Sequence, residues 1–137
     1  MIKLVAVPAD KVAAVWPRLD HLYEDACQYS KGMLTKEAVR VRAENGLGQL
    51  WIAADETTQV TATCITSTIA FPGGLKAMFV ELVGGSIKYD IFEFRTTLEK
   101  HAAADGCSAV FFMVPRKWAK RLPDYKISHL LLCKELA

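Results

Sequence analysis

The sequence predicts one mixed α/β domain spanning residues 1–137, in the order β-α-α-β-β-β-α-β-α-β, with helices on both faces of a central mixed sheet. Strand-length apolar runs alternate with helical patterns from Leu75 onward, which indicates a crossover between parallel strands. Two β-rich runs in the middle are separated by a short polar turn, as in an antiparallel hairpin. The 137 residues, 52% of them hydrophobic, suit a single domain with its own core.

The first third of the chain predicts one strand and two helices. Ile2–Val7 is a short apolar run that ends before a proline, and we expect a strand. Asp10 is a suitable N-cap, and apolar residues then recur at helical spacing as far as Cys27. Pro17 lies inside this pattern and should kink or split the helix. A second, polar helix is expected to follow an N-cap at Thr35 and to reach about residue 44.

The middle of the chain predicts a three-strand meander. Gly48–Ala54 and Gln59–Ala70 read as strands, and the polar turn between them should pair them as an antiparallel hairpin. Phe71–Gly74 contains Pro-Gly-Gly and indicates the next turn. Leu75–Val83 is almost continuously apolar, so we expect a strand that is buried on both faces.

The last part of the chain predicts a crossover and two further strands. The pair Gly84-Gly85 is expected to form a turn that opens a helix over Ile87–Ala104. Ala109–Val114 reads as a strand in the centre of the sheet, and Pro115 suits the first position of a short helix. Ile127–Cys133, with the sequence ISHLLLC, is expected to be the closing strand.

Glu81 is the one acidic residue in the Leu75–Val83 strand. Strict alternation would place it on the face of Phe79 and Val83. The opposite face would then carry Met78, Val80 and Leu82.

Charge and composition exclude several function classes. The net charge of +2 is too small to favour nucleic-acid binding, although the basic stretch Arg116–Lys126 keeps a salt-dependent interaction open as a weak third alternative. The three histidines lie in different predicted elements without metal-ligand spacing, so no metal site is expected. The four cysteines are scattered among apolar neighbours, which is typical of free thiols in a reducing compartment. With no signal-peptide pattern or membrane span at the N-terminus, we expect a cytoplasmic protein with no membrane association.

Two segments carry a resemblance to a known family. Glu81–Ser86 reads ELVGGS and resembles the Gln/Arg-x-x-Gly-x-Gly/Ala motif that follows the fourth strand in the GNAT superfamily of N-acetyltransferases. Gly84 matches the first glycine of the motif and Ser86 takes the place of the second small residue, whereas Glu81 replaces the amide or basic residue. Ala102–Cys107 resembles the A-x-x-x-G-C approach to the fifth strand, and the likeness in element order covers nearly the whole chain.

The chain is most similar, within that superfamily, to small GNAT-like proteins of bacteriophages and prophages. These carry an Arg-x-Gly-Trp-x-x-x-Leu-x-x-Tyr segment, and Arg116–Tyr125 resembles it with a spacing change around the missing glycine. If encoded by a phage, the protein would act in the host cytoplasm.

The resemblance implies a set of site residues. A glycine turn at the start of a helix offers free N–H groups and a favourable dipole to a phosphate, and in the family this turn grips the pyrophosphate of acetyl-CoA. The cofactor-binding residues so implied are Leu82, Val83, Gly84, Gly85, Ser86 and Ile87. Glu81 takes the place of the family's general base, and Tyr125 that of the acid that protonates the leaving thiolate. Arg116 is a further anion-binding candidate because it follows the end of a strand, where ligands of α/β sheets gather.

Two functions therefore compete. The first is an acetyl-CoA-dependent N-acyltransferase whose acceptor, a small-molecule or protein amine, the sequence does not identify. The alternative is a catalytically degenerate phage or prophage GNAT-like protein that keeps the scaffold and acts through a protein partner. A homodimer is compatible with both. Glu81 at the start of the phosphate-binding motif favours the alternative, and the small residues that follow favour the enzyme.

Overall fold

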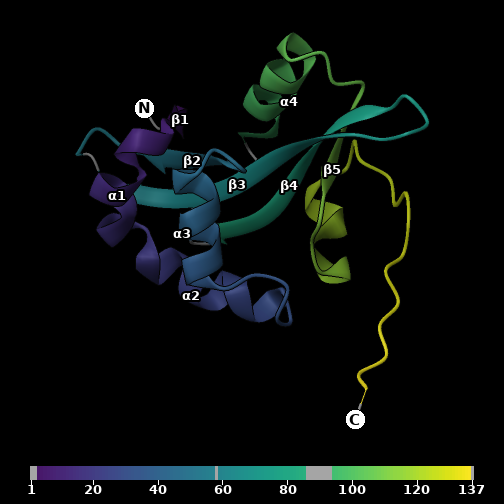
Figure 1. The fold of residues 1–137 in the computed structure, drawn as a ribbon, viewed down its shortest axis with the longest axis horizontal. Helices are drawn as coiled ribbons and strands as arrows, with labels where there is room; N and C mark the ends of the chain where they lie inside the picture. The colour runs from purple at the N-terminus through teal and green to yellow at the C-terminus, as the bar shows by residue number, and fades with distance from the viewer. Residues whose placement is uncertain (1–2, 58, 86–93, 137) are drawn as a thin grey trace.

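The computed structural model describes residues 3–57, 59–85 and 94–136, and it contains one five-stranded mixed sheet with the strand order β1-β2-β3-β4-β5 (Figure 1). The strands are β1 (Lys3–Val7), β2 (Gln49–Ala54), β3 (Val60–Ala70), β4 (Lys76–Gly85) and β5 (Ala109–Phe112). The first four pair antiparallel with their neighbours, and β5 pairs parallel with β4. The mixed sheet that the sequence predicts is confirmed.

Helices cover both faces of this sheet, as expected. The helical elements are η1 (Ala9–Lys11), α1 (Val12–Val15), η2 (Trp16–Arg18), α2 (Asp20–Tyr29), α3 (Lys36–Glu44), α4 (Arg95–Ala104) and η4 (Arg116–Arg121). Helices α1 to α3 lie on one face, called here the α3 face, and α4 lies on the other, called the α4 face (Figure 1). None of the described helices is long and apolar enough to cross a bilayer.

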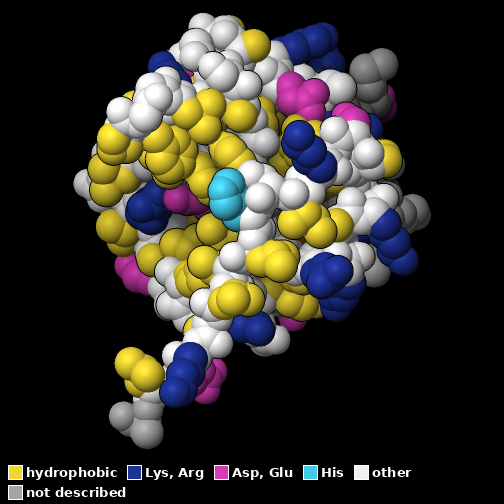
Figure 2. All heavy atoms as spheres, turned by 90° about the vertical axis from the view of Figure 1, so that its right-hand side faces the viewer, with side chains coloured by type: hydrophobic (Ala, Val, Ile, Leu, Met, Phe, Trp, Pro, Cys, Tyr) yellow, Lys and Arg dark blue, Asp and Glu magenta, His cyan; other side chains and the backbone are white. Residues whose placement is uncertain are grey.

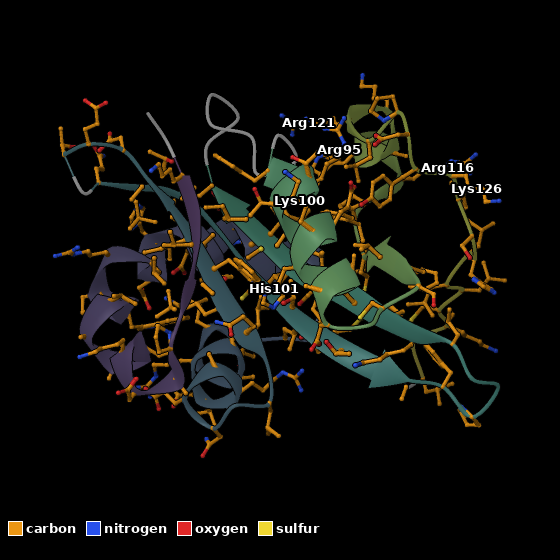
Figure 3. All side chains as sticks on the ribbon, turned by 90° about the horizontal axis from the view of Figure 1, so that it is seen from above. Arg95, Lys100, His101, Arg116, Arg121 and Lys126 are labelled. Atoms are coloured by element: carbon orange, nitrogen blue, oxygen red, sulfur yellow. The ribbon has the colours of Figure 1, made fainter. Side chains whose placement is uncertain are left out.

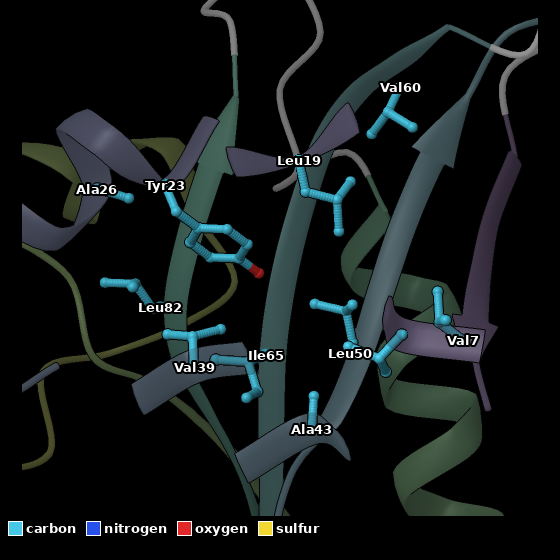
Figure 4. Close-up of a cluster of buried hydrophobic side chains, with 11 residues drawn as sticks. Val7, Leu19, Tyr23, Ala26, Val39, Ala43, Leu50, Val60, Ile65 and Leu82 are labelled. Atoms are coloured by element: carbon cyan, nitrogen blue, oxygen red, sulfur yellow. The ribbon is translucent and has the colours of Figure 1, made fainter. Parts of the chain in front are cut away.

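Each face has its own apolar core. The core of the α3 face consists of Val7, Val12, Leu19, Tyr23, Ala26, Val39, Ala43, Leu50, Val60, Ile65 and Leu82, and Figure 4 shows labelled side chains of this set converging between helices and strands. The core of the α4 face consists of Leu4, Trp51, Ala53, Ala62, Cys64, Met78, Val80, Leu98, Ala102 and Leu122. The buried Tyr23 hydroxyl lies 3.0 Å from Thr63 Oγ1, and Trp51 Nε1 donates to Thr66 Oγ1, also at 3.0 Å, so these large polar side chains are satisfied within the cores.

The N-terminal helical region follows the local signals of the sequence only in part. Thr35 caps α3 as expected, because its Oγ1 accepts a hydrogen bond from the Ala38 amide at 3.1 Å. The expected split at Pro17 is present, since a 3-10 turn over Trp16–Arg18 separates α1 from α2. The expected cap at Asp10 is wrong: Pro8 occupies the cap position of a 3-10 turn, which has no side-chain cap.

The glycine pair belongs to a strand instead of a turn. Gly84 pairs with Thr63 and Gly85 with Ala62, so β4 extends beyond the expected end at Val83. A Cβ at Gly84 would lie 2.6 Å from the carbonyl oxygen of Leu22. The glycine is therefore required because the backbone of α2 passes directly over this point of the strand. The expected turn at Gly84-Gly85 is therefore wrong, and the first part of the helix expected from Ile87 falls within residues 86–93, outside the described residues.

The end of the chain differs most from the expectation. The structure has no strand over Ile127–Cys133, and β5 lies at the edge of the sheet instead of its centre. The apolar run supplies a segment able to pair, but a strand forms only where a neighbouring edge donates and accepts backbone hydrogen bonds. Here the segment runs away from the body of the molecule and makes no such ladder (Figure 1).

Candidate functional site

The pairing of β4 with β5 ends part-way along β4. The parallel ladder runs from Ala77↔Ala109 to Val80↔Phe112, and the Met113 amide adds a last hydrogen bond to the Val80 carbonyl at 3.1 Å. Strand β4 then continues to Gly85 with only β3 as a ladder partner in the described part of the chain. One side of β4 therefore presents backbone amides and carbonyls beyond the point where β5 ends.

A bulge lies at this same point. Ile65 pairs with Leu82 and Thr66 pairs with Val80, so Glu81 is an extra residue on β4. A bulge re-aims side chains, because it interrupts the alternation between faces. Val80 accordingly lies in the core of the α4 face, and Leu82 lies in the core of the α3 face. The expectation that these two side chains share a face is wrong for this reason.

The Glu81 carboxylate is held on the α3 face by two other elements. Arg42 Nη2 from α3 donates to Oε1 at 3.0 Å and to Oε2 at 3.1 Å. Ser67 Oγ from β3 donates to Oε1 at 3.1 Å. The Glu81 side chain is 21% exposed, so it lies at the surface of the core and remains within reach of solvent. Arg42 Nε is buried and has no hydrogen-bond partner among the described residues.

Aromatic side chains lie beside this charged group. The Phe79 ring stacks on Phe111 with 5.1 Å between ring centroids, and Phe71 lies 6.3 Å from Phe79. Phe79 shares the α3 face with Glu81, because it alternates with the inward-facing Met78 and Val80 of the other core. Figure 2, which views the side of the molecule at the right of Figure 1, shows a broad hydrophobic area there with charged side chains set into it.

Tyr125 lies on the opposite face of the sheet. Its hydroxyl donates to Glu99 Oε2 of α4 at 2.6 Å, and its ring packs edge-on against Phe112. Burial, followed by the hydrogen bond to Glu99, raises the pKa of Tyr125 well above its ordinary value. Glu99 and Tyr125 line a pocket of about 390 Å³ together with Cys107. The structure thus does not bring Glu81 and Tyr125 into contact.

Basic residues of α4 and η4 lie on one side of the molecule. Arg95 Nε pairs with Asp124 at 3.0 Å to Oδ1 and 3.2 Å to Oδ2. Figure 3 shows Arg95 and Lys100 of α4 with Arg121 of η4 on one side of the molecule. Arg116 is exposed at the start of η4, and its label lies apart from these three in the same view.

The other sequence-predicted residues are distributed along the end of β4. Leu82 is buried in the core of the α3 face, and Val83 is half-buried against the core of the α4 face. Gly84 is buried and Gly85 is exposed with φ +146°. Ser86 and Ile87 lie outside the described residues. The described residues contain no group of three or more His, Cys, Asp or Glu side chains placed to hold a metal ion.

Sequence reasoning missed Arg42, Ser67 and Arg95. Arg42 reads as one of several charges on a polar helix, and Ser67 as one of several hydroxyl residues in a β-rich run. Their contacts with Glu81 span 39 and 14 positions of the chain, so no local pattern marks them. A salt bridge of Arg95 with a residue 29 positions away is equally invisible in the sequence.

Solved structures of acetyltransferases superpose on the whole of this fold. A ribosomal-protein-alanine N-acetyltransferase from Brucella melitensis biovar Abortus 2308 superposes with a TM-score of 0.73, at 12% identity over 100% of both chains. The chain has the GNAT acetyltransferase fold. An aminoglycoside acetyltransferase from an uncultured soil metagenomic sample, in complex with sisomicin, gives 0.72 at 9% identity, covering 99% of this chain and 97% of that one. An acetyltransferase from Trypanosoma brucei gives 0.67 at 12% identity, over 99% and 100% of the two chains.

Sequence comparison alone does not find this relation. No family model matches the chain. No curated protein matches it either. At 9 to 12% identity the GNAT likeness is one of fold, and it carries no assignment of acceptor or activity.

Proposed function

We propose that the protein is an acetyl-CoA-dependent N-acyltransferase whose acceptor is a primary amine of unidentified class. The observation that carries the proposal is the coincidence of two features of β4. Glu81, which points to the α3 face, is the extra residue of the bulge, and this bulge lies where the ladder with β5 ends. A carboxylate is therefore positioned beside exposed backbone groups, so an amine at the carboxylate could attack the thioester carbon of a cofactor held by those groups and release its thiolate.

The residues beyond the bulge fit the cofactor. Within Leu82, Val83, Gly84 and Gly85, alternate residues present backbone N–H and C=O groups on the side that β5 leaves free, and these groups suit the amide chain of coenzyme A. Ser86 and Ile87, which the resemblance also implies for the cofactor, lie outside the described residues. The start of α4 suits the phosphates because the helix dipole favours negative charge, and Arg95 in its first turn could join them by leaving Asp124, its partner in this structure. When bound, acetyl-CoA would supply the activated acyl group.

In this proposal Glu81 removes a proton from the amine. Its Oε1 already accepts hydrogen bonds from Arg42 and Ser67, so Oε2, which accepts only from Arg42 among the described residues, is the oxygen better placed to take the proton. The amine would approach over the α3 face, beside the ring of Phe79. Arg42 and Ser67 act as positioning residues in this proposal. Each holds the Glu81 carboxylate in its direction, and neither takes part in the proton transfer itself.

Tyr125 would supply a proton to the leaving thiolate. Its raised pKa keeps the phenol protonated at neutral pH, as a proton donor requires. The proton is donated to Glu99 in this structure, so the phenol would have to turn from Glu99 toward the sulfur.

The first test is binding of acetyl-CoA by the full chain, measured by calorimetry and by thermal unfolding. Saturating acetyl-CoA should raise the unfolding midpoint by several degrees, because a ligand that binds only the folded state stabilises it. Arg116→Glu should weaken binding several-fold if Arg116 contacts the cofactor, whereas Lys120→Glu, an equally exposed change in the same 3-10 helix, should not. An unchanged midpoint at saturating acetyl-CoA would contradict the proposal.

The contact between Arg42 and Glu81 favours a second candidate. Both oxygens of the expected base are engaged by a guanidinium, which is compatible with a scaffold that has lost its chemistry and acts through a protein partner, as in a phage or prophage GNAT-like protein. Glu81→Gln separates the two. In the enzyme, the change leaves acetyl-CoA binding intact and abolishes transfer to amine acceptors; in the scaffold, no acetyl transfer exists to be lost.

A further inference from the structure

The edge of the sheet has a step at the point where β2 begins. Strand β2 starts at Gln49, which pairs with Thr66, whereas β3 continues as far as Ala70. Beyond Thr66, β3 has β4 as its only ladder partner among the described residues. Figure 1 shows β3 and β4 continuing there as an arm that projects from the sheet. Side chains from both faces of the sheet therefore border the same space at this step.

A cavity of about 350 Å³ lies at the step and is called here the edge notch. Helix α4 contributes His101 and Asp105 to its wall, β2 contributes Gln49, and β3 contributes Ser67 and Thr68. The end of β1 and the loop after α3 complete the wall. Small-molecule sites in proteins have volumes of roughly 300–1,000 Å³, so the edge notch is large enough for a small ligand. Glu81 is not among the residues that line it.

The edge notch carries one carboxylate without a balancing cation. Asp105 Oδ2 accepts a long hydrogen bond of 3.4 Å from Thr68 Oγ1. Lys76 Nζ donates to the backbone carbonyl of Asp105 and forms no ion pair with its carboxylate. No lysine or arginine belongs to the described lining of the edge notch. Asp105 also caps the C-terminus of α4, where the helix dipole favours positive charge. The charge of the edge notch therefore suits a cation.

The hydrogen-bond donors of the wall are already engaged. Gln49 Nε2 donates to two backbone carbonyls, at 2.8 and 2.9 Å, so its amide is fixed, and its Oε1 has no donor among the described residues. Ser67 Oγ donates to Glu81, and Thr68 Oγ1 donates to Asp105. The groups left for a ligand are mainly oxygen atoms that accept hydrogen bonds. The edge notch therefore suits a ligand rich in donors.

His101 adds an imidazole to this wall. Its ring packs edge-on against Trp51, with 4.9 Å between ring centroids, and Figure 3 shows it on α4. No hydrogen bond joins its ring nitrogens to another described residue. A neutral imidazole offers one nitrogen that accepts a hydrogen bond and one that donates. Buried apolar side chains, Val7 and Met78, also line the cavity and give it an apolar part beside the polar wall.

We propose that the edge notch binds a small alkylammonium ion, at a site distinct from the amine that would react at Glu81. An ammonium group has three N–H donors and no acceptor, which matches the free oxygen atoms of Asp105 and Gln49. It also supplies the charge that Asp105 leaves unbalanced, and its alkyl chain can lie against Met78 and Val7. Binding requires no acetyl-CoA, so a failure of the proposed acyl transfer leaves this proposal unaffected.

The test is a nuclear magnetic resonance titration of the full chain without acetyl-CoA, at about pH 7, where an alkylamine is protonated. The probes are n-butylamine, 1-butanol and the butyltrimethylammonium ion. We expect n-butylamine to give saturable shifts at the Thr68 and Asp105 amides and at the Met78 methyl group. The alcohol has no charge, and the trimethylammonium ion has charge but no N–H donor. Both should therefore bind at least several-fold more weakly.

Three variants locate the bound amine. Asp105→Asn keeps the size of the side chain and removes its charge, so n-butylamine should bind several-fold more weakly. The matched control is Asp25→Asn, because Asp25 is an exposed helical carboxylate that does not line the edge notch; binding should be unchanged. Glu81→Gln should also leave the shifts at Thr68 and Asp105 unchanged. This last variant separates the edge notch from an amine held by the proposed base.

Four results would overturn the proposal. If n-butylamine produces no saturable shifts at Thr68, Asp105 and Met78, the edge notch does not bind an alkylammonium ion. Equal binding of 1-butanol would show that only the apolar chain is recognised. Equal binding of butyltrimethylammonium would show that the free oxygen atoms play no part. Unchanged binding in Asp105→Asn would place the amine elsewhere on the molecule.

Discussion

Arg42 Nη2 donates to both carboxylate oxygens of Glu81, at 3.0 and 3.1 Å, and so ties α3 to the bulge of β4. The pair joins the one acidic residue of that strand to a helix that reads in the sequence as a polar surface element. It fixes the direction of the proposed base, and it also links the packing of α3 to the sheet.

Removing the guanidinium should destabilise the fold. Arg42→Ala leaves a part-buried carboxylate without its ion-pair partner, so we expect a loss of about 1 kcal/mol in the free energy of unfolding. The measurement is urea denaturation of Arg42→Ala, Glu81→Gln and the double variant. Their coupling free energy should also be about 1 kcal/mol. Arg40→Ala, which removes two surface ion pairs within the same helix, with Glu37 and Glu44, is the control and should leave the urea midpoint almost unchanged. Additive effects of the two single changes would show that the pair contributes nothing to stability.

Gly84 should not tolerate a side chain. Gly84→Ala places a Cβ 2.6 Å from the Leu22 carbonyl oxygen, a backbone atom that moves only if α2 moves, so we expect about 1–3 kcal/mol of destabilisation. Gly73→Ala is the matched control, because a Cβ added at Gly73 would meet no atom within 4 Å, and its urea midpoint should stay close to that of the parent. Equal midpoints for the two variants would contradict the close approach of α2. The same clash makes Gly84 unsuitable as a probe of cofactor binding, since loss of binding would not be separable from loss of the fold.

Stability should fall at alkaline pH. The pKa values of Tyr125 and Tyr23 are raised by burial, so the folded state keeps protons that the unfolded state begins to release near pH 10. Above about pH 10 the unfolded chain therefore binds fewer protons, and the free energy of unfolding decreases as pH rises; below that pH these groups contribute no slope. Tyr125→Phe should reduce the decrease, measured as the urea midpoint at about pH 8 and about pH 11. If the stability of Tyr125→Phe falls with alkaline pH as steeply as that of the parent, Tyr125 does not contribute to the decrease.

Cys64 should be the slowest thiol to react. Its side chain is fully buried in the core of the α4 face, and burial raises the pKa of the thiol, so little thiolate forms and reagent has no access. Native protein treated with a thiol reagent should leave Cys64 unmodified, as peptide mass analysis will show, and urea should expose it. Cys27, which is only half-buried and whose pKa is also raised by burial, is the internal comparison. Rapid native labelling of Cys64 would contradict its place in the core.

Local signals in the sequence were sufficient for most of the framework. The cap at Thr35, the break at Pro17 and the hairpin of β2 with β3 all follow from residues close together in the chain. The crossover from β4 to β5 also follows, because apolar strand patterns flank a helical one and such connections give parallel strands. The resemblance to GNAT motifs placed the candidate site on β4.

The details of the site could not be read in the same way. The bulge at Glu81 changes the faces of the residues after it, and strict alternation has no means of anticipating an inserted residue. The glycine pair suggested a phosphate-binding turn, whereas Gly84 is required by the passage of α2 over the strand. Glu81 and Tyr125 are the base and the acid that the resemblance implies, yet they lie on opposite faces of the sheet.

The sequence by itself determined the elements, their order and the mixed sheet, because capping, periodicity and turn chemistry act over a few residues. Only the tertiary structure decided which groups meet: Arg42 with Glu81, α2 with Gly84, and Tyr125 with Glu99. It also decided that residues 127–133 have no strand beside them in this chain, although their pattern is that of a strand. A strand needs a partner edge, and the position of an edge depends on the packing of the whole sheet.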